Sequence, residues 1–200
     1  LSHPHPTWAA GAEKESYAAS SLMPMQEEEK PNKGALLTTN GRISPFLESL
    51  MKELDYERAP SGGAGNKMLM LLEGKGTAYI QDRGVSRWDT CGAQAVLEAH
   101  GGILCRLDRF LEGNEISYTY RKTDENLDFE ANTACLTKYN AQKGIKLEID
   151  SMAMATSQVK PYANLCGLMA LGKANTSEES RAEILNGLKS AAEASPPAYD

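Results

Sequence analysis

Apolar positions follow a helical period from residue 44 to residue 58. Ser44 is a suitable N-cap and Pro45 suits the first helical position. One apolar stripe at i, i+3 and i+4 spacing is then made by Phe46, Leu47, Leu50, Met51 and Leu54. The pattern predicts a helix that ends near Arg58, ahead of Pro60.

Short apolar runs alternate with further helical segments along the rest of the chain. Thr77 to Gln81, Ile103 to Leu107 and Tyr162 to Ala170 are typical of strands. One helix is expected from Trp88 to about His100, before Gly101 and Gly102, and another after the capping box Thr176-Ser177-Glu178-Glu179, to about Glu193. Strands that alternate with helices predict an α/β layered lobe.

This pattern divides the chain into four segments. Residues 1–33 form a partial strand and an acidic loop, and residues 34–110 form the core α/β lobe. Residues 111–160 are interpreted as an insertion, and residues 161–195 as a closing strand with the C-terminal helix.

The composition is that of an ordinary globular protein. Its 200 residues suit one domain or one lobe of a larger one, with 41% hydrophobic and 24% charged residues. The formal net charge of -6 argues against nucleic acid as a partner. No apolar run is long enough for a membrane span, and no signal peptide follows Leu1, so we expect no membrane partner and a cytoplasmic location. The four cysteines stand far apart, which favours free thiols.

Asp89 is the first candidate for chemistry. It stands at the expected start of a helix, where a carboxylate is favoured by unsatisfied backbone N–H groups. It is therefore either an N-cap or a ligand for Mg²⁺. A Mg²⁺ site generally needs more than one carboxylate, together with phosphate and water.

A glycine-rich stretch, Gly62-Gly63-Ala64-Gly65-Asn66-Lys67, is the second candidate. Glycines allow backbone N–H groups to approach a phosphate, and a lysine adds a positive charge. The spacing is not that of a P-loop, and no Ser or Thr follows Lys67. A tight turn before a helix is the structural alternative.

Taken together, these motifs resemble a known family. The glycine-rich stretch is followed by Leu72-Glu73-Gly74, then by Arg87-Trp88-Asp89-Thr90-Cys91, and then by Gly101-Gly102. This order resembles the second half of the inositol monophosphatase superfamily, in its inositol polyphosphate 1-phosphatase and 3'(2'),5'-bisphosphate nucleotidase group. The resemblance implies the C-terminal lobe of a layered αβαβα sandwich. It also implies that Asp89 binds Mg²⁺, that Gly63 and Lys67 contact the substrate, and that Thr38 and Thr39 lie near it.

The family motifs that supply most metal ligands and help to activate water are absent here. They are an upstream glutamate pair and an Asp-Pro-(Ile/Leu)-Asp motif, and Glu27, Glu28 and Glu29 do not match them. The chain also begins at Leu1 and not at Met. We therefore expect the catalytic residues in a missing N-terminal half, and this chain to be inactive alone.

The resemblance implies a Mg²⁺-dependent, lithium-sensitive phosphomonoesterase acting on a small phosphorylated substrate. One alternative is an inositol polyphosphate, cleaved at the 1-position, and another is 3'-phosphoadenosine 5'-phosphate. The nucleotidases of this group often carry a histidine just after the hydroxyl residues. The stretch Thr38-Thr39-Asn40-Gly41-Arg42 has none, which favours the inositol substrate. Two other classes stay open: a catalytically dead substrate-binding or regulatory relative, and a structural domain in which Asp89 is only a cap.

Overall fold

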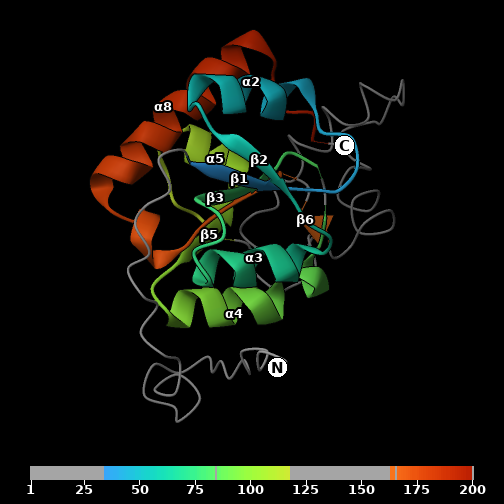
Figure 1. The fold of residues 1–200 in the computed structure, drawn as a ribbon, viewed down its shortest axis with the longest axis vertical. Coiled ribbons are helices and arrows are strands. Elements are labelled where there is room, and N and C mark those ends of the chain that lie inside the picture. Colours follow the sequence, from blue (N-terminus) through green and yellow to red (C-terminus); the bar gives the residue numbers. More distant parts are fainter. Residues whose placement is uncertain (1–33, 84, 118–162, 165, 200) are drawn as a thin grey trace, which may run out of the picture.

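The computed structural model describes residues 34–83, 85–117, 163–164 and 166–199. The expected partial strand and acidic loop at 1–33, and most of the expected insertion at 111–160, lie outside these ranges. The described part is a mixed five-stranded sheet with helices on both faces (Figure 1). The predicted α/β class is therefore confirmed.

The sheet has the strand order β2-β1-β3-β7-β5. Its strands are β1 (Ala35–Thr38), β2 (Glu57–Pro60), β3 (Ala78–Gln81), β5 (Ile103–Arg106) and β7 (Leu168–Leu171). Strands β2, β1 and β3 are parallel, and β7 runs antiparallel to its neighbours β3 and β5. The loops that follow β1, β2 and β3 therefore meet at one edge of the sheet, where ligands bind in open α/β sheets.

One face of the sheet is covered by α2 (Pro45–Glu53), α5 (Leu107–Leu111) and α8 (Glu178–Ala194) (Figure 1). Ser44 caps α2 as predicted, because its Oγ accepts the amide hydrogen of Leu47 at 3.3 Å. The core on this face is apolar and includes Leu36, Phe46, Leu50, Ile80, Phe110, Met169, Ile184 and Leu188.

The opposite face carries α3 (Ala64–Leu72) and α4 (Cys91–Ala99), which pack on each other and on the sheet (Figure 1). The core here includes Leu37, Met68, Leu71, Tyr79, Leu97, Leu104, Leu168 and Ala170. A two-stranded antiparallel sheet joins β4 (Val85–Ser86) to β6 (Ala163–Asn164), and two short 3-10 turns are η1 (Arg87–Asp89) and η4 (Lys173–Asn175).

Two expected element bounds were wrong. The first helix ends at Glu53 and not near Arg58, because Leu54 caps it and Asp55 turns the chain with a φ of 52°. Residues Glu57–Pro60 then form β2, an edge strand with exposed positions and no apolar alternation. The expected strand Tyr162 to Ala170 is divided into β6 and β7, with Gly167 at a φ of 65° between them.

Two other starts lie slightly away from their expected positions. The cap of α8 is Ser177, whose Oγ accepts from the amide of Ser180 at 3.2 Å, and not Thr176. The helix expected from Trp88 is divided into η1 and α4.

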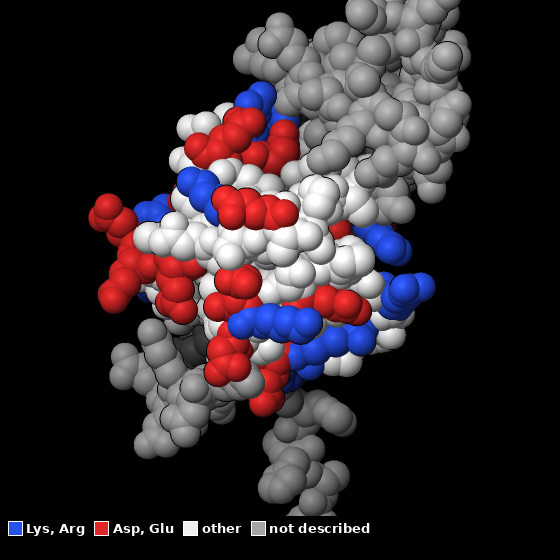
Figure 2. Space-filling view, turned by 90° about the horizontal axis from the view of Figure 1, so that it is seen from above, with Lys and Arg blue, Asp and Glu red and all other residues white. Residues whose placement is uncertain are grey.

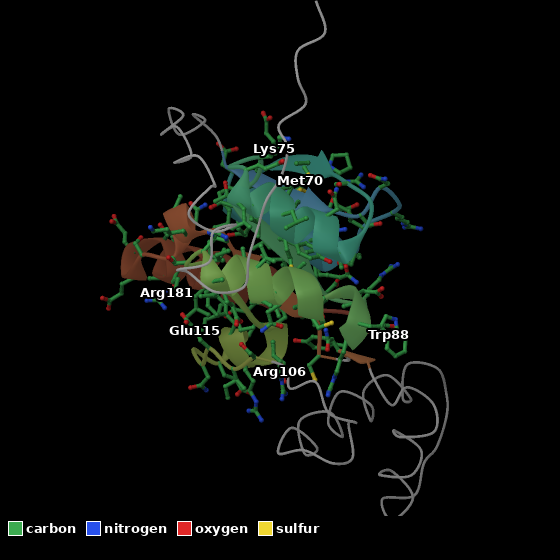
Figure 3. The ribbon with its side chains drawn as sticks, turned by 90° about the horizontal axis from the view of Figure 1, so that it is seen from below. Met70, Lys75, Trp88, Arg106, Glu115 and Arg181 are labelled. Atoms are coloured by element: carbon green, nitrogen blue, oxygen red, sulfur yellow. The ribbon has the colours of Figure 1, made fainter. Side chains whose placement is uncertain are left out.

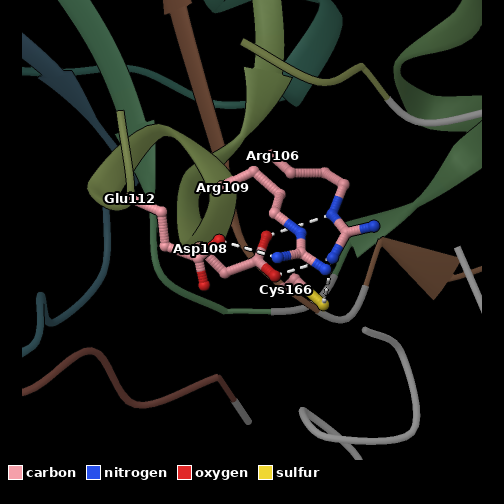
Figure 4. A network of polar contacts seen from close by, with 5 residues as sticks. All are labelled: Arg106, Asp108, Arg109, Glu112 and Cys166. Atoms are coloured by element: carbon pink, nitrogen blue, oxygen red, sulfur yellow. Dashed lines mark hydrogen bonds and ion pairs between the residues drawn. The ribbon is translucent and has the colours of Figure 1, made fainter. Parts of the chain in front are cut away.

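The end of β5 is held by a buried ion pair (Figure 4). Arg106 is 1% exposed, and it donates to both carboxylate oxygens of Asp108, at 3.0 Å and 2.7 Å. Its guanidinium also lies 3.8 Å from the Sγ of Cys166. Cys91 and Cys105 are free thiols. Cys166 is disulfide-bonded, although not to either of these, so the expectation of free thiols was wrong for Cys166.

Acidic side chains predominate on the face of α2 and α8 (Figure 2). The exposed ones on these two helices are Glu48, Glu53, Glu178, Glu179, Glu183 and Glu193. Within the described ranges, no helix combines the length and the apolar character that crossing a bilayer requires.

Candidate functional site

A pocket of about 500 Å³ opens at the edge where β1, β2 and β3 end. Its wall is formed by the loop after β1, the glycine-rich turn after β2, the loop after β3, and the η1 turn. The residues with polar or charged groups that line it are Thr39, Arg42, Ser44, Lys67, Gln81, Asp82, Arg83 and Asp89. Both signs of charge therefore face one cavity.

The glycine-rich turn presents the N-terminus of α3 to this pocket. Gly63 is the N-cap of α3, with a φ of 72° and no side-chain hydrogen bond to the helix end. A residue with a side chain rarely adopts this φ. Gly63 and Ala64 both line the pocket, so the first backbone N–H groups of a nine-residue helix lie at its wall.

Lys67 holds the turn from inside. Its side chain is 3% exposed, and its Nζ donates to the carbonyl oxygens of Ser61 at 3.2 Å and Gly63 at 2.9 Å. The same Nζ lies 4.9 Å from the centre of the Tyr79 ring. Burial lowers the pKa of Lys67. Its ammonium group therefore has three partners within the protein and also borders the pocket.

Asp89 lies at the end of η1 and is not the N-cap of α4. The cap position belongs to Thr90, whose side chain makes no capping bond. The Asp89 side chain is exposed, lines the pocket and makes no hydrogen bond or ion pair with a described residue. The structural alternative for Asp89, a helix cap, is therefore wrong.

The backbone around Asp89 is held by buried polar groups. Thr90 is fully buried, and its Oγ1 donates to the carbonyl of Arg87 at 2.9 Å. Asn164, also fully buried, donates from its Nδ2 to the Oγ1 of Thr90 at 3.2 Å. Segments 74 residues apart in sequence thus fix the turn that carries Asp89. Trp88, beside it, is 66% exposed and projects from the edge of the molecule (Figure 3).

The glycine-rich turn and the Trp-Asp turn are neighbours in space. A Cβ added to Gly65 would lie 3.5 Å from the carbonyl oxygen of Asp89 and 3.4 Å from the Cβ of Ala93. Tyr79 contacts Lys67 through its ring, and its hydroxyl donates at 2.7 Å to the Oε1 of Gln81, the last residue of β3. Burial raises the pKa of Tyr79, and the charge of Asp89 raises it further.

Asp82 is a second carboxylate of the pocket. It follows β3 directly and is 1% exposed. Its Oδ2 accepts from the amide of Ala198 at 3.2 Å, and its carbonyl accepts from the amide of Tyr199 at 2.6 Å. The segment after α8 therefore contacts the backbone and side chain of Asp82, which lines the pocket.

The structure brings most of the predicted site residues together. Gly63, Lys67, Thr39 and Asp89 all line the pocket, although they come from three separate parts of the chain: the glycine-rich turn with α3, the loop after β1, and η1. Thr38 is 1% exposed and does not line it. Sequence reasoning missed Asp82, Arg42 and Asn164. The position of Asp82 directly after a buried strand was a usable signal, whereas the long-range contacts of Asn164 left none.

The donors for a metal ion are incomplete in this part of the chain. Asp89 and Asp82 both reach the pocket, and Mg²⁺ commonly takes one or two carboxylates and completes its shell with phosphate and water. Among the described residues, no group of three or more His, Cys, Asp or Glu side chains could hold a metal ion. The carboxylates fit Mg²⁺ as a partial donor set that a phosphate would extend.

Comparison with known proteins agrees with this arrangement. The model of the inositol monophosphatase family matches residues 10–147, so this chain belongs to that family. The family model extends beyond both motifs in each direction.

Individual relatives match a shorter segment. The chain is 43% identical over 58 residues to mouse and human 3'(2'),5'-bisphosphate nucleotidase 1, which covers 28% of this chain and 18% of each relative. It is 41% identical over 66 residues to the human Golgi-resident adenosine 3',5'-bisphosphate 3'-phosphatase, covering 30% of this chain and 17% of the relative. The matches therefore span less than a fifth of these relatives' lengths, and they support the bisphosphate nucleotidase group.

Proposed function

We propose that this chain forms the substrate-binding lobe of a Mg²⁺-dependent phosphomonoesterase. The observation that carries the proposal is the meeting of the glycine-capped N-terminus of α3 with the Asp89 carboxylate in one pocket. Backbone N–H groups and a positive helix end favour a phosphate, and a carboxylate with no described partner favours a cation beside it.

In this proposal each group has a separate role. The amides at Gly63 and Ala64 receive phosphate oxygens, while Lys67 keeps the turn in shape by binding its carbonyls. Asp89 and Asp82 would hold Mg²⁺, with phosphate and water completing its shell. Mg²⁺, when bound, would neutralise phosphate charge and lower the pKa of a bound water. Water would then displace the ester oxygen at phosphorus and yield an alcohol and inorganic phosphate.

The substrate that we propose carries two phosphate groups. Family membership and the relatives named for 3',5'-bisphosphates support a nucleotide such as 3'-phosphoadenosine 5'-phosphate. An inositol polyphosphate cleaved at the 1-position is the second candidate, supported by the absence of a histidine just after the hydroxyl residues Thr38 and Thr39, where the nucleotidases resembled often carry one. Lithium sensitivity and a cytoplasmic location remain predictions, and one relative is by name a Golgi-resident enzyme.

The test is phosphate release by this chain with Mg²⁺ from inositol 1,4-bisphosphate and from 3'-phosphoadenosine 5'-phosphate, with and without Li⁺. Release that is lost with Asp89→Asn would support the proposal, and the faster substrate would identify the branch. Binding of either compound without release would fit a substrate-binding lobe that lacks the catalytic residues, and equally a substrate-binding relative. If the chain neither binds these compounds nor releases phosphate from them, the proposal is contradicted.

A further inference from the structure

We propose that Arg58 is a positioning residue. It holds the loop after β1, Thr39 to Arg42, and thereby keeps Arg42 facing the pocket. The proposal deepens the proposed function and rests on it. Arg58 lies on the edge strand β2, outside the set of residues that line the pocket, so its effect must pass through the loop that it contacts.

Arg58 makes one hydrogen bond to the last residue of β1 and two to the loop that follows it. Its Nε donates to Thr38 Oγ1 at 3.0 Å, and its Nη2 donates to the carbonyl oxygens of Thr39 at 2.8 Å and Gly41 at 2.6 Å. These are charge-assisted bonds from a planar, fixed group of donors. A lysine has a single point charge on a flexible stem, so it cannot hold all three acceptors in this arrangement.

The loop that Arg58 holds is part of the pocket. Thr39, Gly41 and Arg42 all line it, and the loop leads directly into Ser44, the cap of α2. Within the loop, the amide of Gly41 donates to Thr39 Oγ1 at 3.3 Å. The base of the loop is held separately, because the amide of Ser61 donates to the carbonyl of Thr38 at 2.9 Å. Without Arg58, the segment from Thr39 to Arg42 would still be held at its two ends, but its middle would lose the hydrogen bonds that fix its position.

The loop that Arg58 holds places the side chain of Arg42 at the pocket. Arg42 is exposed, it lines the pocket, and no described residue forms a hydrogen bond or ion pair with it. Arg58 therefore occupies the backbone acceptors that would otherwise compete for a neighbouring guanidinium. A second anionic group of the substrate would meet Arg42 in the same pocket as the glycine-rich turn.

The experiment measures binding of 3'-phosphoadenosine 5'-phosphate and of inorganic phosphate in the presence of Mg²⁺, by calorimetry on the full chain. We compare Arg58→Lys, Arg58→Ala, Arg42→Ala and the double variant Arg58→Ala/Arg42→Ala. Arg181→Ala is the matched control, since Arg181 is a surface arginine whose 2.6 Å pair with Glu115 lies on another part of the molecule (Figure 3).

Both Arg58 variants should bind the bisphosphate at least about ten-fold more weakly, the loss that corresponds to one charged hydrogen bond. Inorganic phosphate should lose less, because it carries no second anionic group for Arg42 to bind. The double variant should lose little more than Arg42→Ala alone. Melting temperatures should stay close to that of the unaltered chain, which separates positioning from stability.

Hydrogen exchange of the peptide that covers residues 38–44 supplies a readout without ligand. Faster exchange in Arg58→Lys is expected. Unchanged exchange, or additive losses in the double variant, would overturn the proposal even if the chain binds phosphate. If the unaltered chain binds neither probe, the proposed function fails, and the exchange result still decides whether Arg58 holds the loop.

Discussion

The two faces of the sheet are built differently. On one face, the buried residues within α2, α5 and α8 are all apolar or glycine, and the buried cap of α2, Ser44, is polar. On the other, α3 buries Lys67 and α4 buries Gln94, and the fully buried Thr90 caps α4. An apolar interface stabilises through area and packing, whereas buried polar groups are tolerated only where they are satisfied, and they then fix one geometry.

The difference teaches where stability and binding lie. The buried polar groups of the second face are those next to the pocket: Lys67 binds the glycine-rich turn, and Thr90 with Asn164 holds the turn of Asp89. We infer that the first face supplies mainly stability, and that the second face also sets the shape of the site.

The largest expected effect comes from the apolar face. Leu188 is fully buried in α8, and Leu188→Ala should lower the free energy of unfolding by about 2–5 kcal/mol, through lost burial and a residual cavity. Urea denaturation measures this loss. The affinity of the remaining folded protein for a phosphate ligand should not change. If Leu188→Ala were as stable as the unaltered chain but bound the phosphate ligand more weakly, the proposed contrast between the two faces would be wrong.

Lys67→Met tests the polar face. The substitution keeps the chain length inside the protein but leaves the carbonyls of Ser61 and Gly63 without their donor. We expect a loss of about 1–3 kcal/mol in stability, because two acceptors lose a partner while a buried charge is also removed. Phosphate binding should weaken by at least about ten-fold. Lys67→Arg, which retains a donor, is the control.

The decrease in the free energy of unfolding at alkaline pH should depend on one buried tyrosine from each face of the sheet. Burial raises the pKa of Tyr79 on one face and of Tyr199 on the other. Below about pH 10 both phenols are neutral in either state, so their contribution is fully present there. Above it the unfolded phenols ionise first, and stability should fall by about 1.4 kcal/mol per pH unit for each tyrosine.

Denaturant unfolding between pH 9 and 11.5 measures this slope, and Tyr199→Phe should reduce it. Asp82, Asp108 and Glu112 carry the nearby negative charges that raise the Tyr199 pKa after burial, while Arg106 lowers it. An unchanged slope in Tyr199→Phe would mean that this phenol ionises normally in the folded protein.

The smallest expected effect is a gain. Gly92 lies in the first turn of α4, and a Cβ added there would meet nothing within 4 Å. Gly92→Ala should therefore raise stability by about 0.5–1 kcal/mol, because alanine loses less backbone freedom in a helix. Thermal unfolding checks this gain. Binding should not change, and a loss of binding would show that Gly92 takes part in the site.

Much of this architecture could be predicted from local signals. Ser44 with Pro45 marked the start of α2, and the apolar runs at Thr77 to Gln81 and Ile103 to Leu107 marked β3 and β5. These signals depend on neighbours within a few residues. The site roles of Asp89 and the glycine-rich turn came from the family resemblance, because the residues alone left a helix cap and a tight turn open as alternatives.

What failed depends on distant residues. The edge strand β2 has no alternating pattern, because it is exposed and is fixed by pairing with β1. Asp82 accepts a hydrogen bond from Ala198, which lies 116 positions later in the chain. Arg58 donates to Thr38, which lies 20 positions earlier. The place of Asp82 directly after a buried strand is a local signal for a candidate residue, but nothing in the local sequence marks the contacts of Arg58.

The central claim is that the glycine-rich turn and Asp89 form one site for phosphate and a divalent cation. The most direct measurement is the affinity of 3'-phosphoadenosine 5'-phosphate at increasing Mg²⁺, for the unaltered chain, Asp89→Asn and Gly63→Ala. The account predicts tighter binding with Mg²⁺, loss of that Mg²⁺ effect in Asp89→Asn, and weaker binding at every Mg²⁺ concentration in Gly63→Ala. Equal affinities and equal Mg²⁺ dependence in all three proteins would contradict it.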